Sequence, residues 1–401
     1  MTFQSFTAAE YLKIDVANNF GLDHENWDVR LAWFDNNEHQ LRDIVRHADC
    51  HALYQAGVQA WEDYKAGKPI GYAVSLDATS SGIQLLSCLV SDPQAASLCN
   101  VIDTGNREDA YLLLYHAMVK RIGEAAKIER KATKLAIMAA FYTSRNEPRR
   151  VFGDGPLLEA FYDTVREEAP GAWELNETFL AIWDNTKDLY SWVLPDNFHV
   201  HVKVMGTNRE TVNFLNRPYE VSYSSQQPVE RGRFLGAHTA HCCDALVVRE
   251  LRWRCHYDPA QLAEVRRVLG CGSPLKTLNT DGDKLVKILW DHYLDSGFLS
   301  ARILRYLTYS NVGHVDPAVV LALMDTLPKK PFNFMPVHDC FRVHPNYGND
   351  IRRQYNQLLH DIAKSDLLSF IMSQQVGRRV KIGKMDPEMY KKILEANYAL
   401  S

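Results

Sequence analysis

The sequence predicts a mixed α+β protein that is mostly helical and has a small antiparallel sheet. Apolar residues recur at three- and four-residue spacing over most of the chain, strand-like runs are few and short, and Pro and Gly occur in small groups rather than in a long linker. Of the 401 residues, 46% are hydrophobic and 23% are charged, close to the average of globular proteins. The composition therefore excludes a mainly disordered chain.

Helical periodicity predicts helices over 106–124, 128–144, 156–168, 239–254 and 350–373. Aromatic and β-branched residues predict strands at 72–76, 199–204, 333–337 and 341–343, and the last two strands flank a tight turn. The stretch 250–330 has a helical periodicity of its own. We expect it to be a small inserted bundle.

Charge and cysteine usage restrict the class of protein. The net charge of -4 argues against binding nucleic acid by overall charge, so phosphate binding must come from local basic patches. The eight cysteines form no C-x-x-C pair and no zinc-site spacing, and we interpret them as reduced thiols. The first residues do not resemble a signal peptide, and no window approaches the ~20 apolar residues of a membrane helix. We expect a cytoplasmic protein without membrane contact.

The first candidate site motif ends the strand predicted at 72–76. Asp77 and Ala78 are followed by the small residues 79–82 and an apolar helix start, which would place a carboxylate and the Ala78 carbonyl at the end of the sheet. Mg²⁺ prefers oxygen ligands of this kind. Asp is also a common N-cap, however, and the motif alone favours capping of the following helix.

The second motif lies on the helix predicted over 128–144. Arg130, Lys134, Met138 and Tyr142 recur every four residues and would form one slowly drifting stripe. Arg forks onto phosphate oxygens, Lys supplies a compact charge, and a base could stack near the tyrosine. The alternative is an amphipathic helix with solvated cations, which spacing alone favours.

The third motif, His338-Asp339, interrupts an apolar run at the turn between the last two predicted strands. A buried acid there would be unfavourable unless it were paired or bound to a metal, although turns also favour Asp for structural reasons. Together, the two acids and the cationic helix are the parts of a two-metal phosphoryl-transfer site acting on a 3'-hydroxyl. Lys134 could donate a proton to the departing pyrophosphate while Arg130 neutralises its charge.

These motifs resemble those of the single-subunit RNA polymerases of bacteriophages and mitochondria, whose palm and fingers are related to family A DNA polymerases. The first motif reads DATSSGIQ from Asp77 and is similar to the family's D-G-S-C-S-G-I-Q. The second reads RKATKLAIMAAFYT from Arg130 and is similar to R-x-x-x-K-x-x-x-M-x-x-x-Y-G. The third reads HDC from His338 and is similar to H-D-S. The resemblance implies a DNA-directed RNA polymerase in which Asp77, Ala78 and Asp339 hold two Mg²⁺ ions.

The resemblance also implies roles on the substrate side. Arg130 and Lys134 would hold the incoming triphosphate, Met138 and Tyr142 would lie at the base and sugar, and His338 would lie beside the primer end. Two further patches extend the substrate site, because Asp109-Ala110-Tyr111 resembles D-I-Y and residues 238–244 resemble N-F-V-H-S-Q-D. They implicate Tyr111 and His241, with His314 as a rival for the role of His241.

Departures from the family pattern accompany these matches. Leu135 replaces a common Arg and Thr143 replaces a Gly.

The resemblance also bears on the sugar of the substrate. Gly82 stands where a family A DNA polymerase has a Glu that blocks the ribose 2'-hydroxyl, and Tyr142 can form a hydrogen bond near that position. We therefore expect ribonucleotide substrates. The alternatives are a family A-like DNA polymerase and a non-catalytic nucleic-acid-binding subunit that kept the fold.

The resemblance implies a division of the chain. Residues 1–100 would be an amino-terminal palm segment with the first catalytic motif, 101–249 the fingers, 250–330 a helical insertion and 331–401 the carboxy-terminal palm. An amino-terminal domain and a thumb are missing by comparison with the family. We therefore expect a second polymerase subunit that supplies them with the remaining palm.

The resemblance is closest to the large catalytic subunit of the split, two-subunit RNA polymerase of schitovirus-type phages. This implies a phage-encoded protein in the cytoplasm of a bacterial host. The expected partners, besides the second subunit, are a DNA template, the RNA product and ribonucleoside triphosphates.

Overall fold

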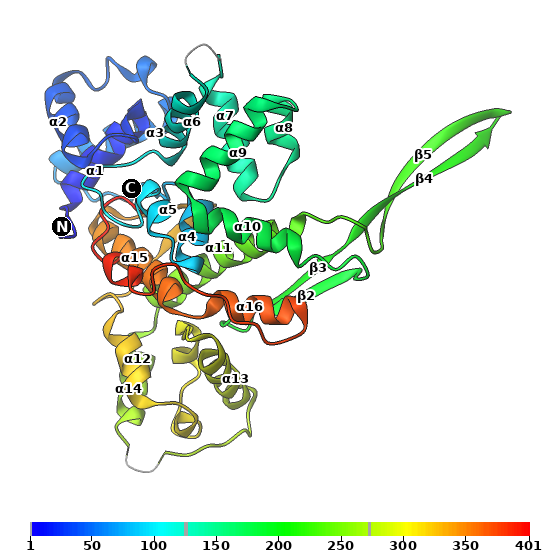
Figure 1. Cartoon of the computed structure of the whole chain (residues 1–401). Helices are drawn as coiled ribbons and strands as arrows, with labels where there is room; N and C mark the ends of the chain where they lie inside the picture. Colours follow the sequence, from blue (N-terminus) through cyan, green and yellow to red (C-terminus); the bar gives the residue numbers. More distant parts are fainter. Residues whose placement is uncertain (1, 124–126, 272–273) are drawn as a thin grey trace.

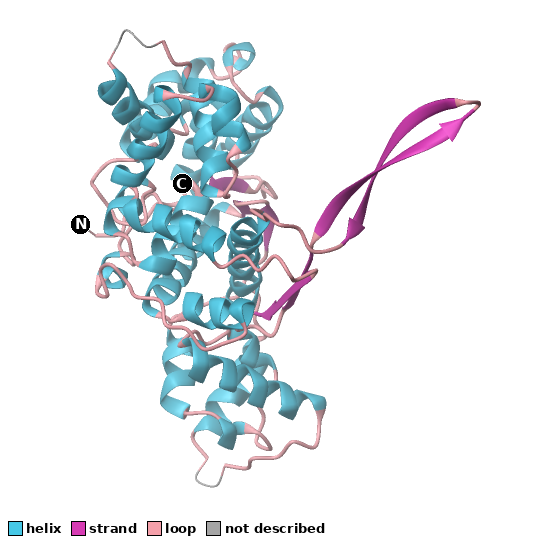
Figure 2. Ribbon diagram, turned by 45° about the vertical axis from the view of Figure 1, so that its right-hand side comes forward, coloured by secondary structure: helices cyan, strands magenta, loops and turns pink. Residues whose placement is uncertain are grey.

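The computed structural model describes residues 2–123, 127–271 and 274–401, which form a mostly helical protein with three small antiparallel sheets (Figures 1 and 2). The helices are α1 (Ala8–Ala17), α2 (Trp27–Asn37), α3 (His51–Lys65), α4 (Ser81–Val90), α5 (Pro93–Leu98), α6 (Ala110–Ile122), α7 (Arg130–Phe141), α8 (Asn146–Phe152), α9 (Pro156–Glu168), α10 (Pro170–Ala181), α11 (Phe234–Cys255), α12 (Pro259–Leu269), α13 (Asp281–Ser296), α14 (Pro317–Asp325), α15 (Gly348–Lys364) and α16 (Leu367–Val376). The strands are β1 (Val74–Asp77), β2 (Leu189–Val193), β3 (His199–Lys203), β4 (Met205–Phe214), β5 (Arg217–Gln226), β6 (Phe334–Val337) and β7 (Cys340–Val343). Within these described ranges, no helix is both long and apolar enough to cross a bilayer.

The central sheet has the strand order β1-β7-β6. Asp77 lies opposite Cys340 in β7, and Cys340 also pairs with Val337 across the two-residue turn made by His338 and Asp339. His338 adopts a left-handed conformation with φ 58°, which tight hairpin turns require at their first position. The two predicted carboxylates therefore lie at the same end of the sheet.

Helix α4 follows β1 and packs against α10, α11 and α15. It begins at Ser81, and every residue in it except Gly82 is buried. Because its N-cap is Ser80, Asp77 does not cap this helix, and the capping interpretation is wrong. Residues 399–401 run along β1, where Asp77 N donates to Ser401 O at 3.0 Å and Ser401 N donates to Asp77 O at 2.9 Å.

Helices α6 and α7 correspond to the predicted helices at 106–124 and 128–144, although both are shorter. The side chain of Asp109 caps α6 by accepting from the backbone N–H groups of Tyr111 and Leu112. The last predicted residue of that helix, Glu124, lies outside the described residues. Helix α7 buries one face through Thr133, Ala136, Ile137 and Ala140, whereas Arg130, Lys134 and Met138 are exposed. The helix is therefore amphipathic, with the predicted stripe on its open side.

Two features of the carboxy-terminal half differ from the prediction. The helix expected over 350–373 is broken between α15 and α16, where Ser365 is extended and Asp366 N donates to Ser296 O at 2.7 Å. Helix α11 begins five residues before the predicted start at 239. The expected bundle within 250–330 has a hydrophobic cluster of its own, formed by Val265, Val286, Leu289, Ile303, Val320 and their neighbours.

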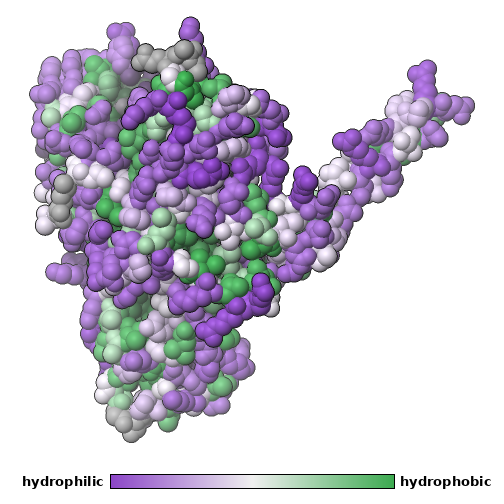
Figure 3. Space-filling model, viewed as in Figure 1, coloured by the Kyte–Doolittle hydropathy of each residue, from purple (hydrophilic) through white to green (hydrophobic). Residues whose placement is uncertain are grey.

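Strands β4 and β5 form a long two-stranded ribbon that projects from the body and was not predicted (Figures 1 and 2). Its two turn residues, Leu215 and Asn216, both have positive φ, as type I′ hairpins require. Residues 209–224 are all exposed. The surface of the ribbon is mainly hydrophilic to neutral (Figure 3). Tyr219, Val221 and Tyr223 alternate with polar residues in β5, but both faces of the ribbon are exposed, so this alternation marks no buried face.

Candidate active site

A cavity of about 290 Å³ lies at the end of the central sheet where Asp77 and Asp339 meet. Its lining comes from β1, the start of α4, the loop before α6, α7 and the β6–β7 turn. Seven predicted site residues line it, namely Asp77, Ala78, Tyr111, Lys134, Met138, Tyr142 and Asp339. The other three, Arg130, His241 and His338, do not line the cavity.

The two carboxylates are held close together by backbone pairing. Ala78 N donates to the backbone oxygen of Asp339 at 3.1 Å. Loss of hydration raises the pKa of Asp77 from 3.8 to about 6, and the negative charge of Asp339 acts in the same direction. Neither carboxylate forms an ion pair with a Lys or Arg in the described part of the chain. Arg107, in the same cavity, lowers the pKa of Asp77, but two neighbouring acids without an ion pair still provide the charge and oxygen chemistry that divalent cations prefer.

Protein side chains alone do not complete a metal centre here. Among the residues that the structure describes, no group of three or more His, Cys, Asp or Glu side chains is placed to hold a metal ion. Mg²⁺ commonly uses one or two carboxylates and takes its other ligands from water and substrate phosphates. Asp77, Asp339 and the Ala78 carbonyl therefore fit a Mg²⁺ site that substrate and water complete.

A third acid, Asp244 on α11, lies near this pair. Burial raises its pKa from 3.8 to about 6, and the nearby charge of Asp339 contributes. Asp244 ends the motif over 238–244 that includes His241, and the motif itself predicts no role for it in the site. Its position adds negative charge to the same end of the sheet.

The cations of the α7 stripe contact the first turn of α6. Lys134 Nζ lies 5.1 Å from the ring centre of Tyr111, and Arg130 Nη2 lies 3.2 Å from Asp109 Oδ2. The Arg130 side chain is 54% exposed, so this ion pair is weak. Both cations can therefore exchange these partners for a strongly charged ligand at modest energetic cost.

Tyr142 follows the last residue of α7 and closes another side of the cavity. Its ring stacks on His241, with ring centres 4.8 Å apart and planes inclined by 11°. On the other side it packs on Gly82, where the space left by the missing side chain is filled by the tyrosine and does not remain open. Burial raises the pKa of Tyr142 to about 12, so its hydroxyl is protonated and can donate at neutral pH.

The remaining predicted histidines are distributed differently. His338 is exposed at the β6–β7 turn, beside Asp339. His314 lies in the 250–330 bundle and forms a hydrogen bond with the Thr277 carbonyl at 3.0 Å. The stacking on Tyr142 thus favours His241 over His314 as the histidine of this site.

Sequence reasoning missed three cavity residues: Asp23, His24 and Arg107. Asp23 and His24 follow a kink at Gly21, which has φ 121°. Arg107 lies in the loop before α6, and Asn26 Oδ1 accepts a hydrogen bond from its backbone N–H at 2.6 Å. No spacing pattern in the sequence links these loops to the motifs, because only tertiary packing brings them together.

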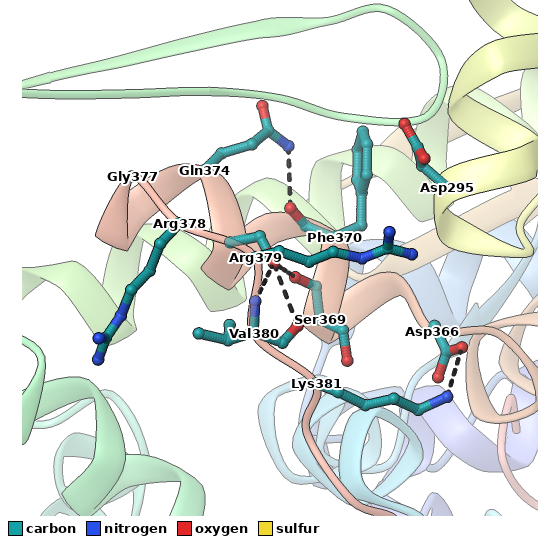
Figure 4. Close-up of a pocket in the computed structure, with 11 residues that line it drawn as sticks. Asp295, Asp366, Ser369, Phe370, Gln374, Gly377, Arg378, Arg379, Val380 and Lys381 are labelled. Carbon is teal, nitrogen blue, oxygen red and sulfur yellow. Dashed lines mark hydrogen bonds and ion pairs between the residues drawn. The ribbon is translucent and has the colours of Figure 1, made fainter.

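A larger hollow of about 540 Å³ lies elsewhere, between α13, α16 and residues 377–381 (Figure 4). Arg378, Arg379 and Lys381 line it together with Asp295 and Asp366, and Lys381 Nζ lies 3.5 Å from Asp366 Oδ2. None of the predicted site residues belongs to it. The smaller cavity at the central sheet is therefore the candidate active site.

Two comparisons with known proteins concern the amino-terminal part of the chain. Residues 5–146 match the family model described as DNA-dependent RNA polymerase. The chain is also 32% identical over 126 residues to a probable DNA-directed RNA polymerase of Neurospora crassa, a match that covers 29% of this chain and 14% of that relative. The chain thus corresponds to a small part of the relative. The family match includes Asp77, Lys134 and Tyr142, whereas Asp339 lies outside it.

Proposed function

We propose that this chain carries the catalytic centre of a DNA-directed RNA polymerase of the single-subunit phage and mitochondrial type. The observation that carries the proposal is the cavity in which Asp77 and Asp339, from paired strands, face Lys134, Met138 and Tyr142 of the α7 stripe. The family match over 5–146 independently supports the same reaction.

In this proposal residues 1–100 and 331–401, with the central sheet, α4 and α15, form the palm, and residues 101–249, with α6 to α10 and most of α11, form the fingers. Residues 250–330 are an insertion with its own hydrophobic cluster. The reaction site lies between palm and fingers, where α7 faces the carboxylates across the cavity.

The proposed metal ligands are Asp77, Asp339 and the Ala78 carbonyl, which support binding of two Mg²⁺ ions through their charge and oxygen chemistry. When bound, the ions supply positive charge for attack by the RNA 3'-hydroxyl and for departure of pyrophosphate. We propose that His338, next to Asp339 on the exposed turn, lies beside the primer end.

On the nucleotide side, the chain's own residues bind and orient the triphosphate. Lys134 and Arg130 leave Tyr111 and Asp109 to contact phosphate oxygens, and Lys134 donates a proton to the departing pyrophosphate. Met138 is exposed one turn further along α7, where it can pack on the base. Tyr142, held by His241 and Gly82, directs its hydroxyl to the sugar, so we propose ribonucleotides as substrates.

The proposed partners are a DNA template, the RNA product, ribonucleoside triphosphates and a second polymerase subunit, in a phage-infected bacterial cytoplasm. The test is to express the chain alone and with the products of neighbouring genes, and to measure Mg²⁺-dependent ribonucleotide incorporation on single-stranded DNA. We expect incorporation by the complex. If the chain alone incorporates ribonucleotides, the proposed need for a second subunit is wrong. If neither the chain nor the complex incorporates them, the proposed function is wrong.

Substitutions separate the alternatives. Asp77→Asn and Asp339→Asn are expected to abolish incorporation, whereas Asp154→Asn, an exposed acid on the loop after α8, serves as the matched control and is expected to have no effect. Full activity of the two site variants would indicate a non-catalytic subunit. Equal use of deoxyribonucleotides would indicate a DNA polymerase.

A further inference from the structure

Arg107 is a cation of the candidate site that neither the motifs nor the comparisons assign. It lies in the loop before α6 and lines the cavity together with Asp77 and Lys134. Its loop is fixed by the hydrogen bond from Arg107 N to Asn26 Oδ1 at 2.6 Å. This hydrogen bond holds the backbone at Arg107 against Asn26, the residue that precedes α2.

The Arg107 guanidinium is incompletely paired. Nη1 donates to the Glu108 carbonyl at 3.2 Å, but Nε is buried and has no hydrogen-bond partner. In the described part of the chain, the guanidinium forms no ion pair, although Asp109, Asp23 and Asp77 are close enough to influence its charge. A partly buried guanidinium whose buried Nε has no hydrogen-bond partner is unfavourable unless an acceptor binds it.

The surroundings indicate where that anion lies. Lys134 rests on the ring of Tyr111, and Arg130 pairs with Asp109, so both cations lie at the first turn of α6. Arg107 precedes the same turn by two residues and also interacts electrostatically with Asp109. Three cations from two segments of the chain thus lie around the start of α6, and two of them, Arg107 and Lys134, line the cavity with Asp77 and Asp339.

We infer that Arg107 binds the β- and γ-phosphates of the incoming nucleotide, and the pyrophosphate that leaves, together with Arg130 and Lys134. This inference rests on the proposed function. Asp109 is already paired with Arg130, and within the described residues neither Asp23 nor Asp77 forms an ion pair with Arg107, so a triphosphate entering the cavity would satisfy the guanidinium. Leu135 stands beside Lys134 where the related polymerases commonly have an Arg, and Arg107 supplies a cation from the neighbouring loop in its place.

The test measures pyrophosphate binding to the full chain by titration calorimetry, with Mg²⁺ present. Arg107→Gln is expected to weaken binding by ~10- to 100-fold, as expected for loss of hydrogen bonds to a charged group, and Arg107→Lys by less. Arg166→Gln is the matched control, since Arg166 is exposed on α9 and pairs only with Asp163. Binding of a nucleoside monophosphate, which lacks both outer phosphates, is expected to be unchanged in all variants.

Unchanged pyrophosphate affinity in folded Arg107→Gln would overturn the inference, and so would an equal loss of monophosphate binding. Thermal unfolding of each variant, with Arg107→Lys as the conservative change, distinguishes lost binding from lost structure. In the reconstituted polymerase the KM for ribonucleotides should rise in parallel while kcat changes less. A different result would contradict only the proposed function. In that case the unaltered complex would make no RNA, although the chain would still bind pyrophosphate in a way that depends on Arg107.

Discussion

The ring of Tyr142 packs directly on the backbone of Gly82. A Cβ atom at residue 82 would lie 2.8 Å from the Tyr142 hydroxyl oxygen and 3.0 Å from Cζ, both closer than van der Waals contact. His241 stacks on the same ring at 4.8 Å. Tyr142 is therefore held between α4 and α11, and its hydroxyl is directed by both neighbours.

Gly82→Ala is expected to displace the Tyr142 ring and to lower ribonucleotide incorporation by ~5- to 100-fold, because overpacking of this kind costs about 1–3 kcal/mol. Incorporation assays at saturating and limiting nucleotide will measure the loss. Gly71→Ala is the matched control, since nothing lies within 4 Å of the added atom there, and its activity should be unchanged. Equal activity of the two variants would show that the contact with Gly82 does not position the tyrosine.

Divalent cations are expected to stabilise the protein through the Asp77–Asp339 pair. At neutral pH these uncompensated carboxylates repel each other, and a bound cation removes the repulsion. At ten times its Kd, Mg²⁺ would add about 1.4 kcal/mol to the free energy of unfolding, detectable as a rise in the thermal midpoint. The rise should disappear on chelation.

Asp77→Asn and Asp339→Asn should each remove most of this Mg²⁺ response, while Asp154→Asn should retain it. An undiminished response in both site variants would show that the cation binds elsewhere. Because the measurement needs no template or partner, it tests the carboxylate pair independently of RNA synthesis.

The parts of the site that could be predicted are those encoded locally in the sequence. Asp77 ends a strand, the α7 stripe repeats every four residues, and His338-Asp339 fills a two-residue turn. Each pattern indicates a local structure that forms as expected. Arg107 and Asp23 carry no such signal, because their loops reach the cavity only through contacts such as that of Arg107 with Asn26.

The same reasoning explains the errors in the fold. The break between α15 and α16 was missed because apolar spacing continues through it. Ser365-Asp366 before the apolar run at Leu367 is the helix-start signal that the sequence offers, and in the fold Asp366 N donates to Ser296 O. The β4–β5 ribbon lacks a buried face. The signal available for a hairpin was Asn216 in a two-residue turn, followed by the strand-forming residues Tyr219 and Val221.

Stability is expected to depend on the ionisation of Glu250, which is fully buried on α11. Burial raises its pKa from 4.5 to about 7, although Arg254 and the hydrogen bond from Ala301 N oppose the shift. The folded protein therefore binds a proton that the unfolded chain has lost between these pH values. The free energy of unfolding should fall as pH rises from about 4.5 to 7, by about 3 kcal/mol for this group alone.

Glu250→Gln should flatten this part of the stability profile, measured by chemical denaturation between pH 5 and 8, because the amide does not ionise. Buried Asp15 has a pKa of about 6 and contributes a slope over a lower range, which the variant should keep. A Glu250→Gln profile parallel to that of the natural protein would contradict the assignment.

The β4–β5 ribbon is expected to contribute nothing to the stability of the body. Residues 209–224 are exposed along both strands, with Phe214 61% and Leu215 80% exposed. Replacing residues 210–221 by Asn-Gly should therefore leave the thermal midpoint unchanged within about a degree, because almost no apolar surface leaves the core.

In contrast, Trp192→Ala in the shorter β2–β3 hairpin should destabilise the protein by about 3–5 kcal/mol, since Trp192 is buried and donates to Cys242 Sγ at 3.4 Å. A large loss on shortening the ribbon would mean that it packs against the body in solution.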